Sequence, residues 1–154
     1  MYEKYGQYID GKWQKSSDGG TYDVINPATE EVLGKASKAT EKDVEKALKS
    51  AEKGLLLWRK TSPWERSKII RKISDLIRER KEVLAKWMTL EVGKPFLEGI
   101  GEVGGAADIF EWNAEETKRI YGQIVESRFE NTRMYVKYEP VGVVAALVPW
   151  NFPL

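Results

Sequence analysis

The residue of this chain best suited to chemistry is an asparagine in a stiff turn. Asn151 lies within Pro149-Trp-Asn-Phe-Pro153, directly after the apolar run Val143–Val148. Each proline biases the residue before it towards extended geometry, so the turn would hold the Asn151 amide in one direction. A fixed NH₂ group can stabilise a developing oxyanion by about 2.7–4 kcal/mol. The amide could instead cap the strand end in an Asx-type turn, and the local pattern by itself favours that structural role.

The apolar run before this turn predicts a strand buried on both faces. Val143–Val148 carries no charge and no period-two alternation, which is typical of a parallel sheet covered by helices. Ligands of open α/β sheets bind at the carboxyl ends of such strands, where the turn lies. No other segment has this pattern, although a doubly wound sheet needs several such strands. We therefore expect a fragment whose last strand belongs in the middle of a larger architecture.

Three other groups of residues invite a chemical interpretation. Glu111 and Glu115 share one helical face and could form an acid–base pair, but a solvated face is the commoner arrangement for such residues. Gly93-Lys94-Pro95 lacks the spacing of a phosphate loop and predicts a helix stop. The stretch Arg59–Arg80 alternates basic with acidic residues, as exposed helices do. No G-x-G-x-x-G motif follows a predicted strand, so the usual dinucleotide fingerprint is missing.

Composition narrows the possible functions. Lys and Arg total 25 and Asp and Glu total 24, so no net field favours nucleic acid or an acidic membrane. The chain has no cysteine and no histidine, which removes thiolate nucleophiles, imidazole bases and ordinary zinc sites. No membrane-spanning stretch and no signal-peptide pattern are present, so we expect a cytoplasmic protein. The Lys/Glu-rich surface favours a thermophilic source.

The elements that must position the turn can be predicted from periodicity and capping residues. Asp10-Gly11 predicts a type I′ hairpin turn. Thr40 with Asp43 predicts a helix start, and Gly54 a helix end. The remaining expected elements are, in order, extended segments at 21–25 and 31–33, a helix capped by Ser62 with the apolar stripe Ile69, Ile73, Leu76 and Ile77, a helix at 83–90, a glycine-rich helix at 96–119, and a hairpin formed by 123–128 and 133–139.

Five motif segments follow one another along the chain and together cover essentially all of it. They are Tyr8-Ile-Asp-Gly-Lys-Trp13, Ile25-Asn-Pro-Ala-Thr-Glu-Glu-Val-Leu-Gly34, Thr89-Leu-Glu-Val-Gly-Lys-Pro95, Glu139-Pro-Val-Gly-Val143 and Pro149-Trp-Asn-Phe-Pro153. In this order they resemble the N-terminal part of the NAD(P)-dependent aldehyde dehydrogenase family. Glu111–Gly122 is most similar to the succinate-semialdehyde dehydrogenase branch.

The resemblance implies an α/β fold: the N-terminal part of a Rossmann-type cofactor domain together with a β-hairpin oligomerisation arm. Residues 1–121 and 141–154 would belong to the cofactor domain and 122–140 to the arm, which reaches a neighbouring subunit of a homo-oligomer. The catalytic domain would be absent. The expected substrate is an aldehyde, with succinate semialdehyde as the candidate that the branch suggests, and the expected cofactor is NAD or NADP.

The resemblance also assigns roles to the terminal turn. Asn151 matches the family asparagine whose amide stabilises the thiohemiacetal oxyanion, which reverses the local preference for a cap. Phe152 matches a position at the mouth of the substrate tunnel. The family's catalytic cysteine and glutamate lie downstream of the matched region, so the fragment alone should be inactive; a truncated, non-catalytic interaction module is the alternative. Backbone atoms expected to line the cofactor groove belong to Leu147, Val148, Pro149 and Trp150.

Overall fold

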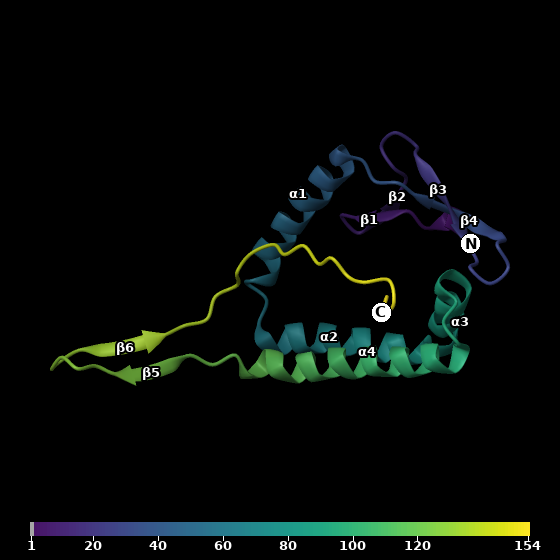
Figure 1. Ribbon diagram of the computed structural model, residues 1–154. Helices are drawn as coiled ribbons and strands as arrows, with labels where there is room; N and C mark the ends of the chain where they lie inside the picture. Colours follow the sequence, from purple (N-terminus) through teal and green to yellow (C-terminus); the bar gives the residue numbers. More distant parts are fainter. Residues whose placement is uncertain (1) are drawn as a thin grey trace.

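Two antiparallel hairpins form the N-terminal part of the structure, a computed structural model that describes residues 2–154 (Figure 1). Asp10 and Gly11 have φ angles of 54° and 75°, as the predicted type I′ turn requires. The second hairpin extends beyond Gly34, where the sequence predicted an end. Gly34 lies inside the strand, and the Tyr2 ring occupies the space that a Cβ would need at that position. The elements are η1 (Tyr2–Lys4), β1 (Gln7–Ile9), β2 (Lys12–Gln14), β3 (Thr21–Ile25) and β4 (Val32–Ser37).

Four helices follow, and their starts agree better with the sequence than their ends. Thr40 and Asp43 form the predicted capping box, and Ser62 caps the second helix as expected. Gly54 does not end the first helix, so that prediction was wrong. The apolar residues after it continue the helix, and the Arg59 N–H closes it on the Leu55 carbonyl. The helices are α1 (Glu41–Trp58), α2 (Pro63–Glu79), α3 (Lys81–Val92) and α4 (Phe96–Glu116), followed by η2 (Thr117–Arg119).

Helix α2 packs on α4 through small residues, and of its predicted apolar stripe Ile77 packs against the helical core. Ser67 and Ser74 are buried, and the Ser74 hydroxyl donates a 2.7 Å hydrogen bond to the Ala107 carbonyl. Ile69 and Ile73 of the predicted stripe remain exposed. Small side chains let the two helix backbones approach closely, while the N-terminal half of the stripe stays exposed.

Helices α3 and α4 enclose the best-packed core. Ala85, Met88 and Val103 are buried there, with Ile77, Leu84 and Ile100 against them. Gly99 permits this approach, because a Cβ at that position would lie 3.3 Å from the backbone of Ala85. Close packing therefore explains one glycine of the glycine-rich helix, whereas Gly101 and Gly105 face open space.

The C-terminal part contains one hairpin and no sheet strand after it. Strands β5 (Gln123–Glu126) and β6 (Arg133–Val136) pair as predicted, although each is shorter than expected. Val143–Val148 has no strand structure, so the predicted core strand is not formed within residues 2–154. Its backbone groups have no neighbouring strand to bond with, because the described sheets are three separate two-stranded hairpins.

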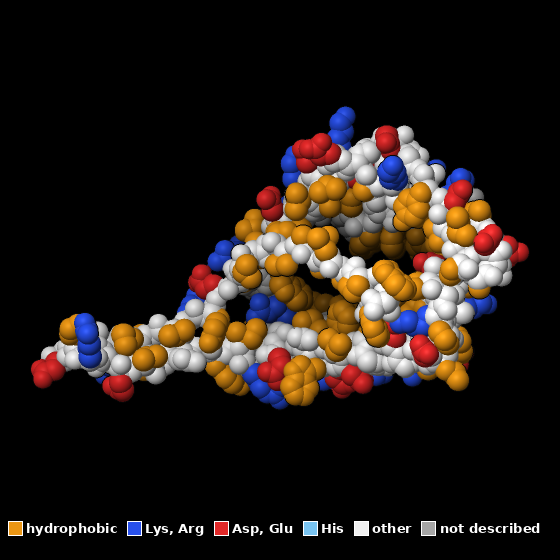
Figure 2. All heavy atoms as spheres, in the orientation of Figure 1, with side chains coloured by type: hydrophobic (Ala, Val, Ile, Leu, Met, Phe, Trp, Pro, Cys, Tyr) orange, Lys and Arg blue, Asp and Glu red, His pale blue; other side chains and the backbone are white. Residues whose placement is uncertain are grey.

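The elements surround an open space instead of a closed core. Helix α1 runs obliquely between α2 and the N-terminal hairpins, the β5–β6 hairpin projects outward, and the C-terminal segment crosses the opening (Figure 1). Figure 2 shows hydrophobic side chains lining this opening. The accessible surface is 12287 Å², whereas a compact monomer of this mass would expose about 7,900 Å². Much apolar surface is therefore exposed.

Candidate functional site

The terminal turn is held against the junction of α3 and α4 by one lysine. Lys94 lies between Gly93, whose φ of 74° ends α3, and Pro95, which precedes α4. The predicted helix stop is thus confirmed. The Lys94 ammonium lies 2.6 Å from the main-chain oxygen of Asn151 and 4.3 Å from the centroid of the Phe152 ring. Lys94, which the sequence indicated only as part of a helix stop, therefore binds the terminal turn.

Glu102 on α4 contacts both Lys94 and the terminal turn, and Lys94 and Glu102 together are called the anchor below. Glu102 forms an ion pair with Lys94, and its second carboxylate oxygen accepts a 3.2 Å hydrogen bond from the Leu154 N–H. The two side chains are only 12% and 6% exposed. No local motif marks Glu102, because its partners are 8 and 52 residues away in the sequence.

The predicted site residues form one continuous, exposed segment. Leu147 is 98% exposed, and Val148, Trp150 and Phe152 are also largely exposed. Pro149 and Asn151 belong to the same exposed class. The structure brings the main chain of Asn151 to Lys94 and that of Leu154 to Glu102, and leaves the predicted cofactor-facing residues exposed along the C-terminal segment.

The carboxylate pair on α4 is paired with arginines of α2. Arg71 contacts Glu111 at 2.8 Å and also contacts Glu115, and Arg78 contacts Glu111 at 2.6 Å. Hydrogen bonds from Lys118 and Arg71 lower the pKa of Glu115 to about 2, and those from Arg71 and Arg78 lower the pKa of Glu111. Both carboxylates stay ionised at neutral pH, so they join two helices and do not form an acid–base pair.

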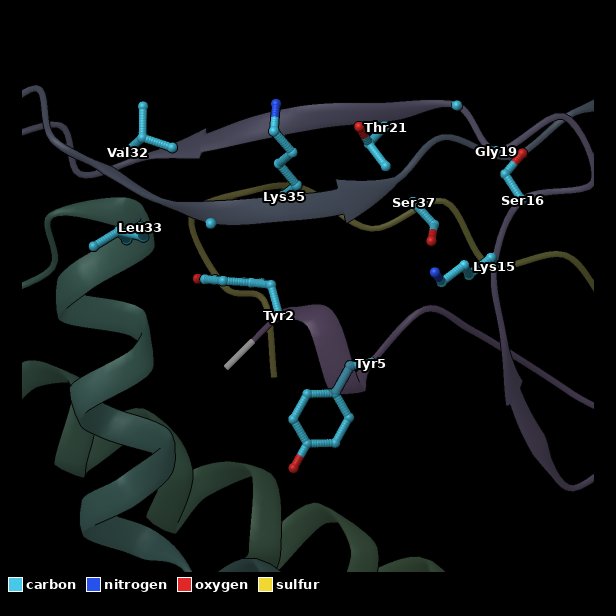
Figure 3. A pocket seen from close by; sticks show the side chains of 12 residues that line it. Tyr2, Tyr5, Lys15, Ser16, Gly19, Thr21, Val32, Leu33, Lys35 and Ser37 are labelled. Carbon is cyan, nitrogen blue, oxygen red and sulfur yellow. The ribbon is translucent and has the colours of Figure 1, made fainter.

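A hollow of about 670 Å³ lies beside the β3–β4 hairpin but contains none of the predicted site residues. Its lining includes Tyr2, Tyr5, Lys15 and Lys35, and Figure 3 shows the two tyrosines on the N-terminal segment beneath the hairpin. The Tyr2 hydroxyl donates to Glu91; burial and this hydrogen bond raise the Tyr2 pKa. Tyr2 therefore links the N-terminal segment to α3, which is a structural role. Since the hollow also lacks the predicted site residues, the terminal turn is the better candidate site.

Two kinds of site are not found in the described part of the chain. Within residues 2–154 there is no group of three or more acidic, cysteine or histidine side chains able to hold a metal ion. None of the helices described there has the length and apolar character needed to cross a membrane.

Comparison with known proteins identifies the family. The sequence profile described as "Aldehyde dehydrogenase family" matches residues 13–154. The chain belongs to the aldehyde dehydrogenase family. This agrees with the resemblance seen in the sequence motifs. One structurally similar protein, a betaine aldehyde dehydrogenase from Staphylococcus aureus, was solved in complex with NAD+.

Semialdehyde dehydrogenases are among the relatives of this family member. The chain is 47% identical over 146 residues to a mitochondrial succinate-semialdehyde dehydrogenase of Oryza sativa subsp. japonica, covering 95% of the chain and 28% of that protein. It is 42% identical over 146 residues to a glutarate-semialdehyde dehydrogenase of Pseudomonas putida, covering 95% of the chain and 30% of that protein. The chain therefore spans under a third of the length of these relatives.

A solved structure confirms the fold of the matched part. The succinate-semialdehyde dehydrogenase from Burkholderia pseudomallei superposes with a TM-score of 0.94 at 39% identity, over 97% of this chain and 31% of that one. The mixed α/β arrangement is thus that of the N-terminal part of an aldehyde dehydrogenase.

Proposed function

We propose that this chain is the N-terminal part of an aldehyde dehydrogenase that oxidises a semialdehyde to the carboxylic acid with NAD or NADP. The observation that carries the proposal is the family match over residues 13–154, which includes the complete Pro149-Trp-Asn-Phe-Pro153 turn. The semialdehyde substrate is supported by the names of the relatives, of which succinate semialdehyde is our first choice.

In this proposal the terminal segment supplies one catalytic group and part of two binding surfaces. The Asn151 amide donates to the oxyanion formed when a cysteine thiolate attacks the aldehyde. Backbone groups of residues 147–150 line the cofactor groove, and Phe152 lies at the substrate entrance. The hairpin at 122–140 contacts a neighbouring subunit of a homo-oligomer. The exposed position of residues 147–152 is what an unfilled groove would leave.

A single substitution in the protein that contains this chain tests the catalytic role. Asn151→Ala removes the amide, so kcat for succinate semialdehyde should fall about 10²–10³-fold, as for loss of one oxyanion donor. The Michaelis constant for the dinucleotide should change little. Asn113→Ala is the matched control, because the Asn113 amide only bonds the Ile109 carbonyl on its own helix. Equal kcat values for the two variants would remove Asn151 from the mechanism.

The 154 residues alone should produce no reduced nicotinamide with any aldehyde. The chain contains no cysteine, and the family's chemistry needs a thiolate nucleophile. The alternative function is a non-catalytic interaction module that docks on a full-length dehydrogenase through the hairpin at 122–140. Turnover by the isolated chain would contradict both functions, whereas binding to an active dehydrogenase without turnover of its own would favour the module.

A further inference from the structure

The Lys94–Glu102 pair is the least exposed ion pair in the part of the chain that the structure describes. An ion pair taken out of water is weak evidence for stability, because desolvation offsets most of the attraction. A buried pair that also bonds distant backbone can instead define one conformation. Here the distant backbone is the terminal turn that carries Asn151.

The pair contacts both ends of residues 151–154. The Lys94 ammonium donates to the Asn151 main-chain oxygen, and Glu102 accepts from the Leu154 N–H. The ammonium also lies over the Phe152 ring, at 4.3 Å from its centroid. Within residues 2–154, these are the only hydrogen bonds from residues 149–154 to the rest of the chain.

The backbone on both sides of Lys94 is restrained. Its neighbours are a glycine in the left-handed region and a proline, which join the end of α3 to the start of α4. Glu102 lies on α4, whose packing against α3 is fixed by the contact of Gly99 with Ala85. The anchor is therefore part of the best-packed region, while the turn that it holds is otherwise exposed.

We propose that Lys94 and Glu102 are positioning residues that orient the Asn151 amide by fixing the main chain of the turn. This inference rests on the proposed function only for its catalytic consequence. Neither side chain needs to touch the substrate. An amide displaced by about 1 Å can lower a rate by about a hundredfold, so the anchor would act on kcat through Asn151.

The first experiment needs no activity. The chain contains four asparagines, Asn26, Asn113, Asn131 and Asn151, so selective ¹⁵N labelling gives four side-chain amide signals. Lys94→Met releases the main chain of the turn, so it should change the shift and raise the mobility of the Asn151 amide signal and leave the other three unchanged. Lys94→Arg, which keeps the charge, should retain much of the wild-type signal. Lys68→Met is the control, because Lys68 forms an exposed ion pair with Glu65.

The second experiment measures catalysis in the protein that contains this chain. Lys94→Met should lower kcat about a hundredfold, with little change in the Michaelis constants. Combined with Asn151→Ala, it should lower kcat no further than Asn151→Ala alone, since both changes remove one oxyanion contact. A merely structural lysine would give additive losses.

The two experiments separate the two proposals. An unchanged Asn151 signal in Lys94→Met, or additive kcat losses, would overturn the anchor. An inactive wild-type protein would overturn the proposed function, and the amide signals would still decide on the anchor. If Lys94→Met fails to fold, Glu102→Gln replaces it, because it keeps the side-chain length and removes the ion pair.

Discussion

Single carboxylates hold separate segments of this chain together, and Asp43 is the clearest case. The residue is buried, and one of its carboxylate oxygens accepts hydrogen bonds from the Thr40 N–H at 3.0 Å and the Ser17 N–H at 3.1 Å. The Ser16 hydroxyl donates to the same oxygen at 3.2 Å. The capping box was predictable from Thr40 and Asp43. The link to residues 16 and 17 was not, because it depends on how the loop folds back.

These hydrogen bonds predict a pH-dependent contribution of Asp43 to stability. The Thr40 N–H and then the Ser17 N–H hold the pKa of Asp43 well below its ordinary value of 3.8. A depressed folded-state pKa means that the contribution is present in full above pH 3.8 and is lost progressively as the pH falls from there through the lower folded-state pKa. Asp43→Asn should therefore lower the urea midpoint at neutral pH, and its difference from the unsubstituted chain should shrink steadily as the pH is lowered below 3.8.

The control for this prediction is Asp23→Asn, since Asp23 forms an exposed ion pair with Lys35. It should shift the midpoint little at any of these pH values, as exposed pairs contribute only about 0–1 kcal/mol. Equal pH profiles for the two variants would mean that Asp43 is no more important than a surface carboxylate.

At the level of helices, two glycines of α4 offer a matched comparison. Gly101→Ala places a methyl group in open space and should stabilise the chain by up to about 1 kcal/mol, the helix-propensity difference. Gly99→Ala places the same group 3.3 Å from three atoms of Ala85, two of them backbone. That close contact should outweigh the gain in helix propensity, so the denaturant midpoint should fall below that of the unsubstituted chain. Chemical denaturation followed by circular dichroism measures both; a midpoint for Gly99→Ala as high as for Gly101→Ala would show that α3 shifts freely.

Helices also show how far sequence patterns reach. Starts were predictable, because Ser62 and Thr40 bond to backbone within their own first turn. The buried face of α2 was predictable only in part: Ile77 packs against the helical core, but periodicity does not show which partner an apolar stripe meets. In this chain α4 meets Ser67 and Ser74, and Ile73 stays exposed. The interpretation of Glu111 and Glu115 as a solvated pair missed their arginine partners for the same reason.

At the scale of the entire chain, the terminal turn shows what motifs can and cannot supply. The motif around Asn151 pointed to the family, which the comparison confirmed. The role of Lys94 was not predictable, because its contact with Asn151 joins residues 57 positions apart. The predicted strand at 143–148 depends on neighbours that residues 2–154 do not provide, so an apolar pattern alone did not produce a strand.

The open architecture predicts an expanded particle with accessible apolar surface. A compact domain of 154 residues has a radius of gyration of about 15 Å, and this chain exposes far more surface than such a domain would. Small-angle scattering of the monomeric chain should give a larger radius, and a dye that binds apolar surface should fluoresce strongly with it.

Leu48, Leu56 and Leu57 of α1 are exposed and should contribute to dye binding. Replacing these three leucines with glutamine should weaken the fluorescence, whereas replacing the polar residues Lys49, Glu52 and Lys53 of the same helix with glutamine should not. A radius near 15 Å with no dye binding would mean that the helices close on one another in solution and that the chain needs no partner.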